Sequence, residues 1–196
     1  MATHSKLHCQ SFALPAHKAF RQADVVHYHI IHDGYFSLMA LPMLSWLKPT
    51  VWTWHDPWIM TGHCIYPMDC KKWLTGCGGC PDLNRTFAMK TDKTRSNFAI
   101  KKKIARDTKA NVVLASQWMM DMARRSPMSQ GLKLHYIPFG LDLSLYRPLD
   151  GRSLKQKFGV SKDHVVICVR AALGPFKGLE HFVKALERLN TTKSVC

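Results

Sequence analysis

Apolar and polar positions along the chain form short β-branched runs that alternate with longer segments of helical periodicity. The apolar runs are strand candidates and cover residues 23–31, 50–56, 110–116, 132–139 and 164–171. They are continuous runs more than strict alternations, which is typical of parallel strands covered on both faces. The helical segments cover residues 35–47, 96–109, 116–126 and 178–189. This order predicts an α/β fold with a Rossmann-like, doubly wound parallel sheet.

Local signals add helix boundaries and a domain boundary. Ser116 is placed to cap the helix that follows it, and Pro42 marks a helix start or a kink. Prolines and glycines punctuate residues 137–153, after which a new strand and helix follow. We therefore expect three parts. They are a partial N-terminal domain (1–140) with a cysteine-rich loop (62–83), a linker (141–153) and the start of a second Rossmann-like domain (154–196).

The second part holds one predicted strand and one predicted helix, which is too little to bury a core of its own. We therefore expect the sequence to be a fragment, or another chain to complete it. No apolar run approaches the roughly 18 residues of a membrane span, and the first ten residues lack the apolar centre of a signal peptide. These features favour a cytoplasmic protein with reduced thiols.

The chain is basic, with 28 Lys and Arg against 13 Asp and Glu and a net charge of +15. Such a charge suits nucleic acid, an anionic membrane surface or a phosphorylated substrate. No nucleic-acid motif accompanies it, so nucleic acid is the least favoured partner. Residues 90–109 concentrate the charge, and on a helix there Phe98, Ile104 and Ala105 are expected to face inward. The positions expected to face outward are Lys101, Lys102, Lys103 and Arg106. That face is either simply solvated or contacts anionic lipid headgroups.

Four histidines lie at or just past the ends of the first two strand candidates: His27, His29, His32 and His55. Loops after the carboxyl ends of parallel strands are where such sheets bind ligands. Alternation puts His27 and His29 on one side of their strand, with His32 and Gly34 in the loop beyond. His27 alone reads equally as a core histidine. For His29 and His55 we favour hydrogen bonding or acid/base chemistry on a sugar or phosphate over zinc binding, since no further ligand follows at helical spacing.

The stretch "RAALGPFKG" (170–178) predicts a strand, a loop and a helix that begins after Gly178. Such a turn aims backbone N–H groups at an anion, and Arg170 and Lys177 add two cations, as a diphosphate pocket requires. The stretch matches neither a Walker loop nor a GxGxxG fingerprint. A solvated lysine at an ordinary helix start is the other interpretation.

The segment "GHCIYPMDCKKWLTGCGGCPDL" (62–83) holds Cys64, Cys70, Cys77 and Cys80, four of the seven cysteines in the chain. Their spacing, C-x5-C-x6-C-x2-C, favours a closed, structural four-cysteine zinc site that orders a loop without a core of its own. Reduced thiols or loosely formed disulfides are the alternative. A thioredoxin-type redox centre is disfavoured, because Pro81 follows directly where such a motif should open a helix.

Several stretches together resemble a family 4 glycosyltransferase, in the order in which that family carries similar segments. They are "DVVHYHIIHDGYFSL", "VWTWHDPWIMTGHCIYPMDCKKWLTGCGGCPDL", "ASQWM", "YIPFGLDLSLYRP" and "FKGLEHFVKALERL". The cysteine stretch is similar to a bacterial subgroup that builds surface polysaccharides. The resemblance implies a GT-B architecture, in which two Rossmann-like domains hold a nucleotide-diphosphate sugar as co-substrate. It also implies transfer with retention of configuration and without a catalytic metal, to a saccharide or lipid-linked acceptor at the inner face of the plasma membrane.

Position by position, His29 resembles the family histidine that contacts the transferred sugar. The loop from His32 through Gly34 to Tyr35 would border the acceptor together with His55. Arg170 and Lys177 resemble the basic pair on the donor diphosphate, where they would stabilise charge on the leaving nucleotide.

The chain also departs from the family pattern. No glycine-rich loop precedes Ala23, no E-x7-E glutamate pair follows, and Pro138-Phe139-Gly140 stands where the family has Pro-Asn-Gly. These departures indicate truncation at both ends. They keep open a second hypothesis, a non-catalytic truncated remnant that acts as a zinc-stabilised interaction module.

Overall fold

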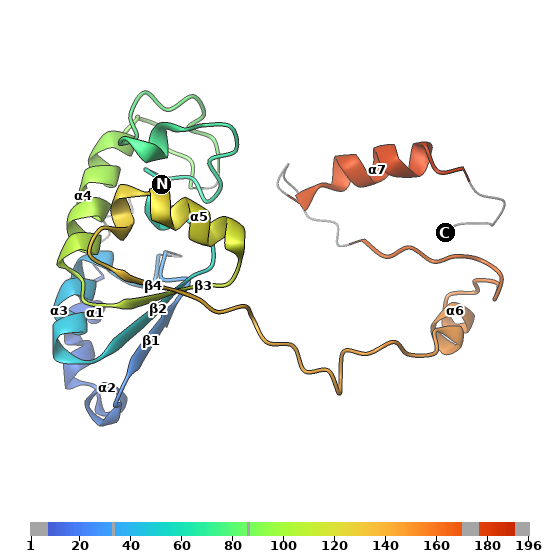
Figure 1. Ribbon diagram of the computed structural model, residues 1–196, viewed down its shortest axis with the longest axis horizontal. Coiled ribbons are helices and arrows are strands. Elements are labelled where there is room, and N and C mark those ends of the chain that lie inside the picture. The colour runs from blue at the N-terminus through green and yellow to red at the C-terminus, as the bar shows by residue number, and fades with distance from the viewer. Residues whose placement is uncertain (1–7, 33, 86, 170–176, 191–196) are drawn as a thin grey trace. The chain divides into compact units, whose positions relative to one another are not determined.

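A four-stranded parallel sheet forms the centre of the first part of the chain in the computed structural model (Figure 1). Its strands are β1 (Val26–His29), β2 (Thr50–Trp54), β3 (Asn111–Leu114) and β4 (Lys133–Tyr136). Their spatial order is β1-β2-β3-β4, and each neighbouring pair is parallel. The structure describes residues 8–32, 34–85, 87–169 and 177–190. The prediction of a Rossmann-like α/β fold, with helices flanking a parallel sheet, is confirmed.

Helices and 3-10 turns fill the segments around the strands. The α-helices are α1 (Gln10–Ala13), α2 (Lys18–Gln22), α3 (Leu41–Leu47), α4 (Thr94–Asp107), α5 (Gln117–Arg125), α6 (Arg152–Lys157) and α7 (Leu179–Glu187). The 3-10 turns are η1 (Leu14–Ala16), η2 (Leu38–Ala40), η3 (Pro57–Met60), η4 (Lys72–Leu74) and η5 (Pro127–Ser129). The Ser116 side chain caps α5 as predicted by accepting the Met119 amide, and Pro42 lies in the first turn of α3, where no intrahelical bond is lost.

One face of the sheet carries the hydrophobic core. Tyr28, Trp52 and Val112 occupy the same register position on neighbouring strands, and all three side chains are buried. Trp54 and Leu114 repeat the pattern two residues on. Right-handed crossovers between strands that follow one another across a sheet place their helices on the same face, so α3, α4 and α5 all cover this core.

The other face of the sheet is polar. Its register positions include His27, His29, Asn111 and His135, and these residues are exposed. For the described residues, the expectation that the strands are apolar on both faces is therefore wrong, and of the two interpretations left open for His27 the core histidine is not observed. The polar face instead brings imidazoles together at the carboxyl end of β1.

Helix α4 corrects the expectation that Lys101 faces solvent. The buried positions of α4 include Phe98, Lys101, Ile104 and Ala105, whose spacing of three to four residues forms one stripe along the helix. Lys101 therefore lies inside the apolar stripe. The other cations expected on the outside, Lys102, Lys103 and Arg106, are exposed. Within the described ranges, no helix combines the length and apolar content needed to cross a bilayer.

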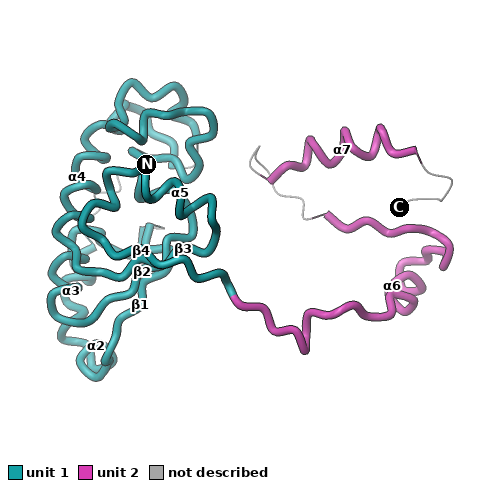
Figure 2. Tube along the Cα trace, viewed as in Figure 1, with its two compact units in different colours: residues 1–139 teal, residues 140–196 magenta. Residues whose placement is uncertain are grey.

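The chain forms two compact units, Met1–Phe139 and Gly140–Cys196 (Figure 2). The second unit contains α6 and α7 among its described residues. The strand expected over 164–171 does not form over 164–169, and the last two of its residues lie outside the described part. Among the described residues, Val165, Val166 and Ile167 are exposed, so this apolar run does not lie in a packed sheet. The interpretation of the two units as partial N-terminal and C-terminal domains stays a prediction.

Candidate functional site

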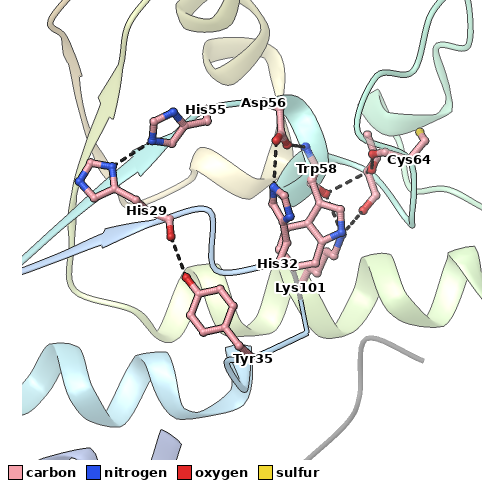
Figure 3. Close-up of polar contacts among 9 residues, drawn as sticks. His29, His32, Tyr35, His55, Asp56, Trp58, Cys64 and Lys101 are labelled. Carbon is pink, nitrogen blue, oxygen red and sulfur yellow. Dashed lines mark hydrogen bonds and ion pairs between the residues drawn. The ribbon is translucent and has the colours of Figure 1, made fainter. Parts of the chain in front are cut away.

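The first pair of functional side chains joins the carboxyl ends of β1 and β2. His29 is the last residue of β1, and His55 follows β2 directly. His29 Nδ1 lies 2.9 Å from His55 Nε2, so one ring donates its proton and the other accepts it (Figure 3). His27 extends this arrangement, since its ring centroid lies 3.9 Å from that of His29 and its Nε2 lies 2.8 Å from Thr53 Oγ1.

A second pair lies one step further along the same two loops. His32 Nε2 is 2.9 Å from Asp56 Oδ2, and the two side chains are only 10% and 13% exposed (Figure 3). Asp56 Oδ1 accepts the Trp58 amide at 2.9 Å and thereby caps η3. The loop after β1 is thus joined to the loop after β2 twice, by His29 with His55 and by His32 with Asp56.

Tyr35 and Gly34, both predicted on the acceptor side, lie in the loop after β1. The Tyr35 hydroxyl donates to the carbonyl of His29 at 3.0 Å, and the side chain is otherwise exposed (Figure 3). Gly34 adopts a φ of +84°, a left-handed conformation that favours glycine and lets the loop turn there. On the opposite side, Phe139 stacks on His55 with ring centroids 5.2 Å apart.

The strand ends line a small, partly open pocket. Its lining includes His32, Thr53, His55, Asp56 and Trp58. Polar hydrogen-bonding groups thus stand beside aromatic and aliphatic side chains.

Burial and neighbouring imidazoles favour the neutral forms of His27 and His55. Burial lowers the pKa of His55, and the nearby His29 lowers it further. The pKa of His27 is lowered by the same two kinds of cause, burial first and then the rings of His29 and His55. Neutral imidazoles present both a donor and an acceptor, so the cluster can bind hydroxyl groups and exchange a proton with them near neutral pH.

Sequence reasoning placed His29, His32, Tyr35 and His55 in one region, and the structure brings them together. It missed Asp56. The available signal was the Asp-Pro dipeptide after β2, because aspartate before a proline at the first helical position is a common helix cap.

The four cysteines of the 62–83 loop line one pocket of about 300 Å³, together with His63. The Gly62 amide donates to Cys77 Sγ at 3.2 Å, and His63 Nε2 lies 3.3 Å from Cys80 Sγ. Burial raises the pKa of Cys64, and it raises that of Cys77 to about 11. A thiol whose pKa is raised in this way is a poor nucleophile near neutral pH.

The ligand arrangement for zinc is not formed in this structure. Among the residues that it describes, no three His, Cys, Asp or Glu side chains stand in positions that could hold a metal ion. The thiols of Cys64, Cys70, Cys77 and Cys80 are all free of disulfides. The four-cysteine zinc site therefore stays a prediction.

The donor side falls in the second unit. Gly178 has a φ of +72° and stands directly before α7, which begins at Leu179. Lys177 is exposed at that helix start, and Arg170 lies outside the described residues. The helix beginning after Gly178 is confirmed, whereas the diphosphate pocket stays a prediction.

Comparison with known proteins gives one partial similarity. No protein-family model matches the chain. The chain is 33% identical over 90 residues to WcaC of Escherichia coli strain K12, a protein provisionally named as a colanic acid biosynthesis glycosyl transferase. The aligned part covers 42% of this chain and 22% of WcaC. The chain thus spans about a fifth of this relative and is similar, over that part, to a glycosyl transferase.

Proposed function

We propose that the protein is a glycosyltransferase of family 4 with a GT-B architecture, which acts in cell-surface polysaccharide synthesis. It transfers a sugar from a nucleotide-diphosphate sugar to a saccharide or lipid-linked acceptor, with retention of configuration. The observation that carries the proposal is a pair of side-chain hydrogen bonds, His29 with His55 and His32 with Asp56. They lie at the carboxyl edge of a parallel sheet, where such folds bind ligands. The partial similarity to WcaC supports the same class.

In this proposal the acceptor hydroxyl attacks the anomeric carbon of the donor sugar. A new carbon–oxygen bond forms, the bond to the diphosphate breaks, and the acceptor proton leaves with the diphosphate. His29 binds the transferred sugar, while His32, Gly34, Tyr35 and His55 border the acceptor. The described contacts support these roles through the hydrogen bond between His29 and His55 and an exposed phenol that donates to the His29 carbonyl.

The second unit supplies the donor contacts in this proposal. Arg170 and Lys177 bind the diphosphate, and the start of α7 after Gly178 adds backbone N–H groups. Positive charge there stabilises the leaving nucleotide as the glycosidic bond breaks. No metal takes part in the chemistry.

The proposed location is the cytoplasmic face of the membrane. Exposed Lys102, Lys103 and Arg106 on α4 support peripheral contact with anionic lipid. Nucleic acid is not a proposed partner.

Zinc has a structural role in this proposal, with Cys64, Cys70, Cys77 and Cys80 as ligands. The support is that all four line one pocket. Metal analysis of the purified chain tests it: about one zinc per chain is expected, lost in Cys77→Ser and kept in Cys168→Ser, whose thiol is exposed. A metal-free chain with four reactive thiols in this loop would refute the zinc site alone.

The function is tested by incubating the chain with uridine and guanosine diphosphate sugars and measuring the nucleotide diphosphate released. Turnover with at least one donor is expected of a completed enzyme that carries this chain. His29→Ala should abolish it, whereas His135→Ala, on the same polar face but on β4, should preserve it. A chain that neither binds nor cleaves any donor but still holds zinc would favour the interaction module instead.

A further inference from the structure

Lys101 is a buried cation with two specific acceptors. Its side chain is 3% exposed within the apolar stripe of α4. Its Nζ donates to the backbone carbonyl of Trp58 at 2.7 Å and to that of Thr61 at 3.0 Å (Figure 3). The same Nζ lies 3.6 Å from the centroid of the Trp58 ring, the geometry of a cation–π contact.

The two acceptors lie within one turn and directly after it. Trp58 lies within η3, and Thr61 follows its last residue, Met60. The start of η3 is held separately, because Asp56 accepts the Trp58 amide. Turn η3 is therefore fixed at its start by Asp56 and at its end by Lys101.

This turn separates the histidine pairs from the cysteine pocket. The Trp58 ring packs against the imidazole of His32, with centroids 5.1 Å apart. On the other side, the Thr61 hydroxyl donates to the carbonyl of Cys64. Movement of η3 would displace Asp56 and thereby the hydrogen bond that orients His32.

We propose that Lys101 is a positioning residue, which holds η3 so that Asp56 and His32 keep the geometry of the candidate site. The inference concerns the geometry of the candidate site. It rests on the proposed function only in the identity of the ligand that this site binds. Two features support it beyond the contacts themselves. A cation is rare at a fully buried position unless it is paired, and an apolar residue would complete the α4 stripe equally well.

The charged and titratable groups around Lys101 determine the pH at which it should be studied. Asp56 and the thiols of Cys64 and Cys77 favour its charged form, and His63 stands nearby. Burial is the larger influence and lowers the pKa of Lys101 to about 7. Experiments at pH 6 therefore observe mainly the ammonium form.

The test compares three variants of the full 196-residue chain by NMR and hydrogen exchange at pH 6. Lys101→Met removes the donor and keeps the length of the side chain, Lys101→Arg keeps a cation, and Lys102→Met changes an exposed neighbour on the same helix. In Lys101→Met, the Trp58 amide should exchange at least about tenfold faster, as loss of one charge-assisted hydrogen bond predicts. The ring resonance of His32 should move as well, with partial recovery in Lys101→Arg.

Wild-type values for Trp58 and His32 in Lys101→Met, or equal changes in Lys102→Met, would overturn the inference. If Lys101→Met does not fold, the inference is tested on the Lys101 side chain of the wild-type chain. A side-chain ammonium signal of Lys101 in slow exchange with water, close in space to the Trp58 ring, is expected. An ammonium that exchanges as fast as that of Lys102 would overturn the inference. None of these readouts needs a sugar nucleotide, so an inactive chain with these contacts intact refutes only the proposed function.

Discussion

The hydrogen bond between His32 and Asp56 predicts a measurable loss of stability when Asp56 is replaced by alanine. The carboxylate accepts two hydrogen bonds at 2.9 Å, one from His32 Nε2 and one from the Trp58 amide. The first joins two nearly buried side chains and should contribute about 1.5 to 3 kcal/mol, because one partner is ionised. The second is a helix cap worth about 1 kcal/mol.

Asp56→Ala should therefore lower the free energy of unfolding by roughly 2 to 4 kcal/mol, and the melting temperature by roughly 5 to 15 °C. Urea unfolding followed by tryptophan fluorescence measures the first quantity, and a thermal scan measures the second. Asp107→Ala is the matched control, because it breaks an ion pair with Arg106 in which both side chains are largely exposed. Such a pair contributes at most about 1 kcal/mol. Equal losses of unfolding free energy in the two variants would refute a stabilising role for the hydrogen bonds of Asp56.

Two further predictions concern packing and pH. Gly62→Ala should destabilise the chain by about 1 to 3 kcal/mol in urea unfolding, because its Cβ would come within 2.6 Å of the Thr94 carbonyl oxygen, whereas Gly140→Ala, with nothing within 4 Å, should be neutral. Acid should also destabilise the fold. Burial lowers the pKa of His27 and His55 in the folded chain below the ordinary value of 6.5, so as the pH falls the unfolded chain binds more protons than the folded chain. Stability should fall as pH drops below about 6.5, by less than about 1.4 kcal/mol per pH unit for each ring because water screens them, and a flat profile from pH 7 to 5 would contradict this.

The sheet was predictable because buried strands leave continuous apolar runs in the sequence. Trp52 and Val112 identify β2 and β3 without knowledge of their partners. The polar face of the sheet was harder to predict, since His27 and His29 stand within β1 as isolated polar positions of an otherwise apolar run. The strand expected around Val165 had β-branched residues, but in the described part of the chain these side chains are exposed and no strand forms over 164–169.

Lys101 shows where residue type and periodicity disagree. A helix that buries Phe98 and Ala105 also turns position 101 inward, because residues three and seven apart lie on one face. From its charge alone, Lys101 was expected to face solvent. The two backbone acceptors that make its burial tolerable lie some 40 residues earlier in the chain, at Trp58 and Thr61, and no local pattern reveals them.

The histidine site was predictable in place but not in detail. The carboxyl ends of neighbouring parallel strands meet at one edge, which brought His29 and His55 together as expected. The partner of His32 depends on how two loops approach each other, which the sequence does not specify. The four cysteines line one pocket, while the zinc site predicted from their spacing stays a prediction, and that spacing did not predict the close approach of His63.

The central claim is that the edge formed by β1 and β2 binds the sugar of a nucleotide-diphosphate donor. The most direct measurement follows the histidine ring resonances of the whole chain while a panel of uridine and guanosine diphosphate sugars is added. We expect the ring resonances of His29 and His55 to shift with at least one sugar nucleotide, while that of His135 on β4 does not. Donor binding that leaves His29 and His55 unmoved, or no binding at all, would contradict it.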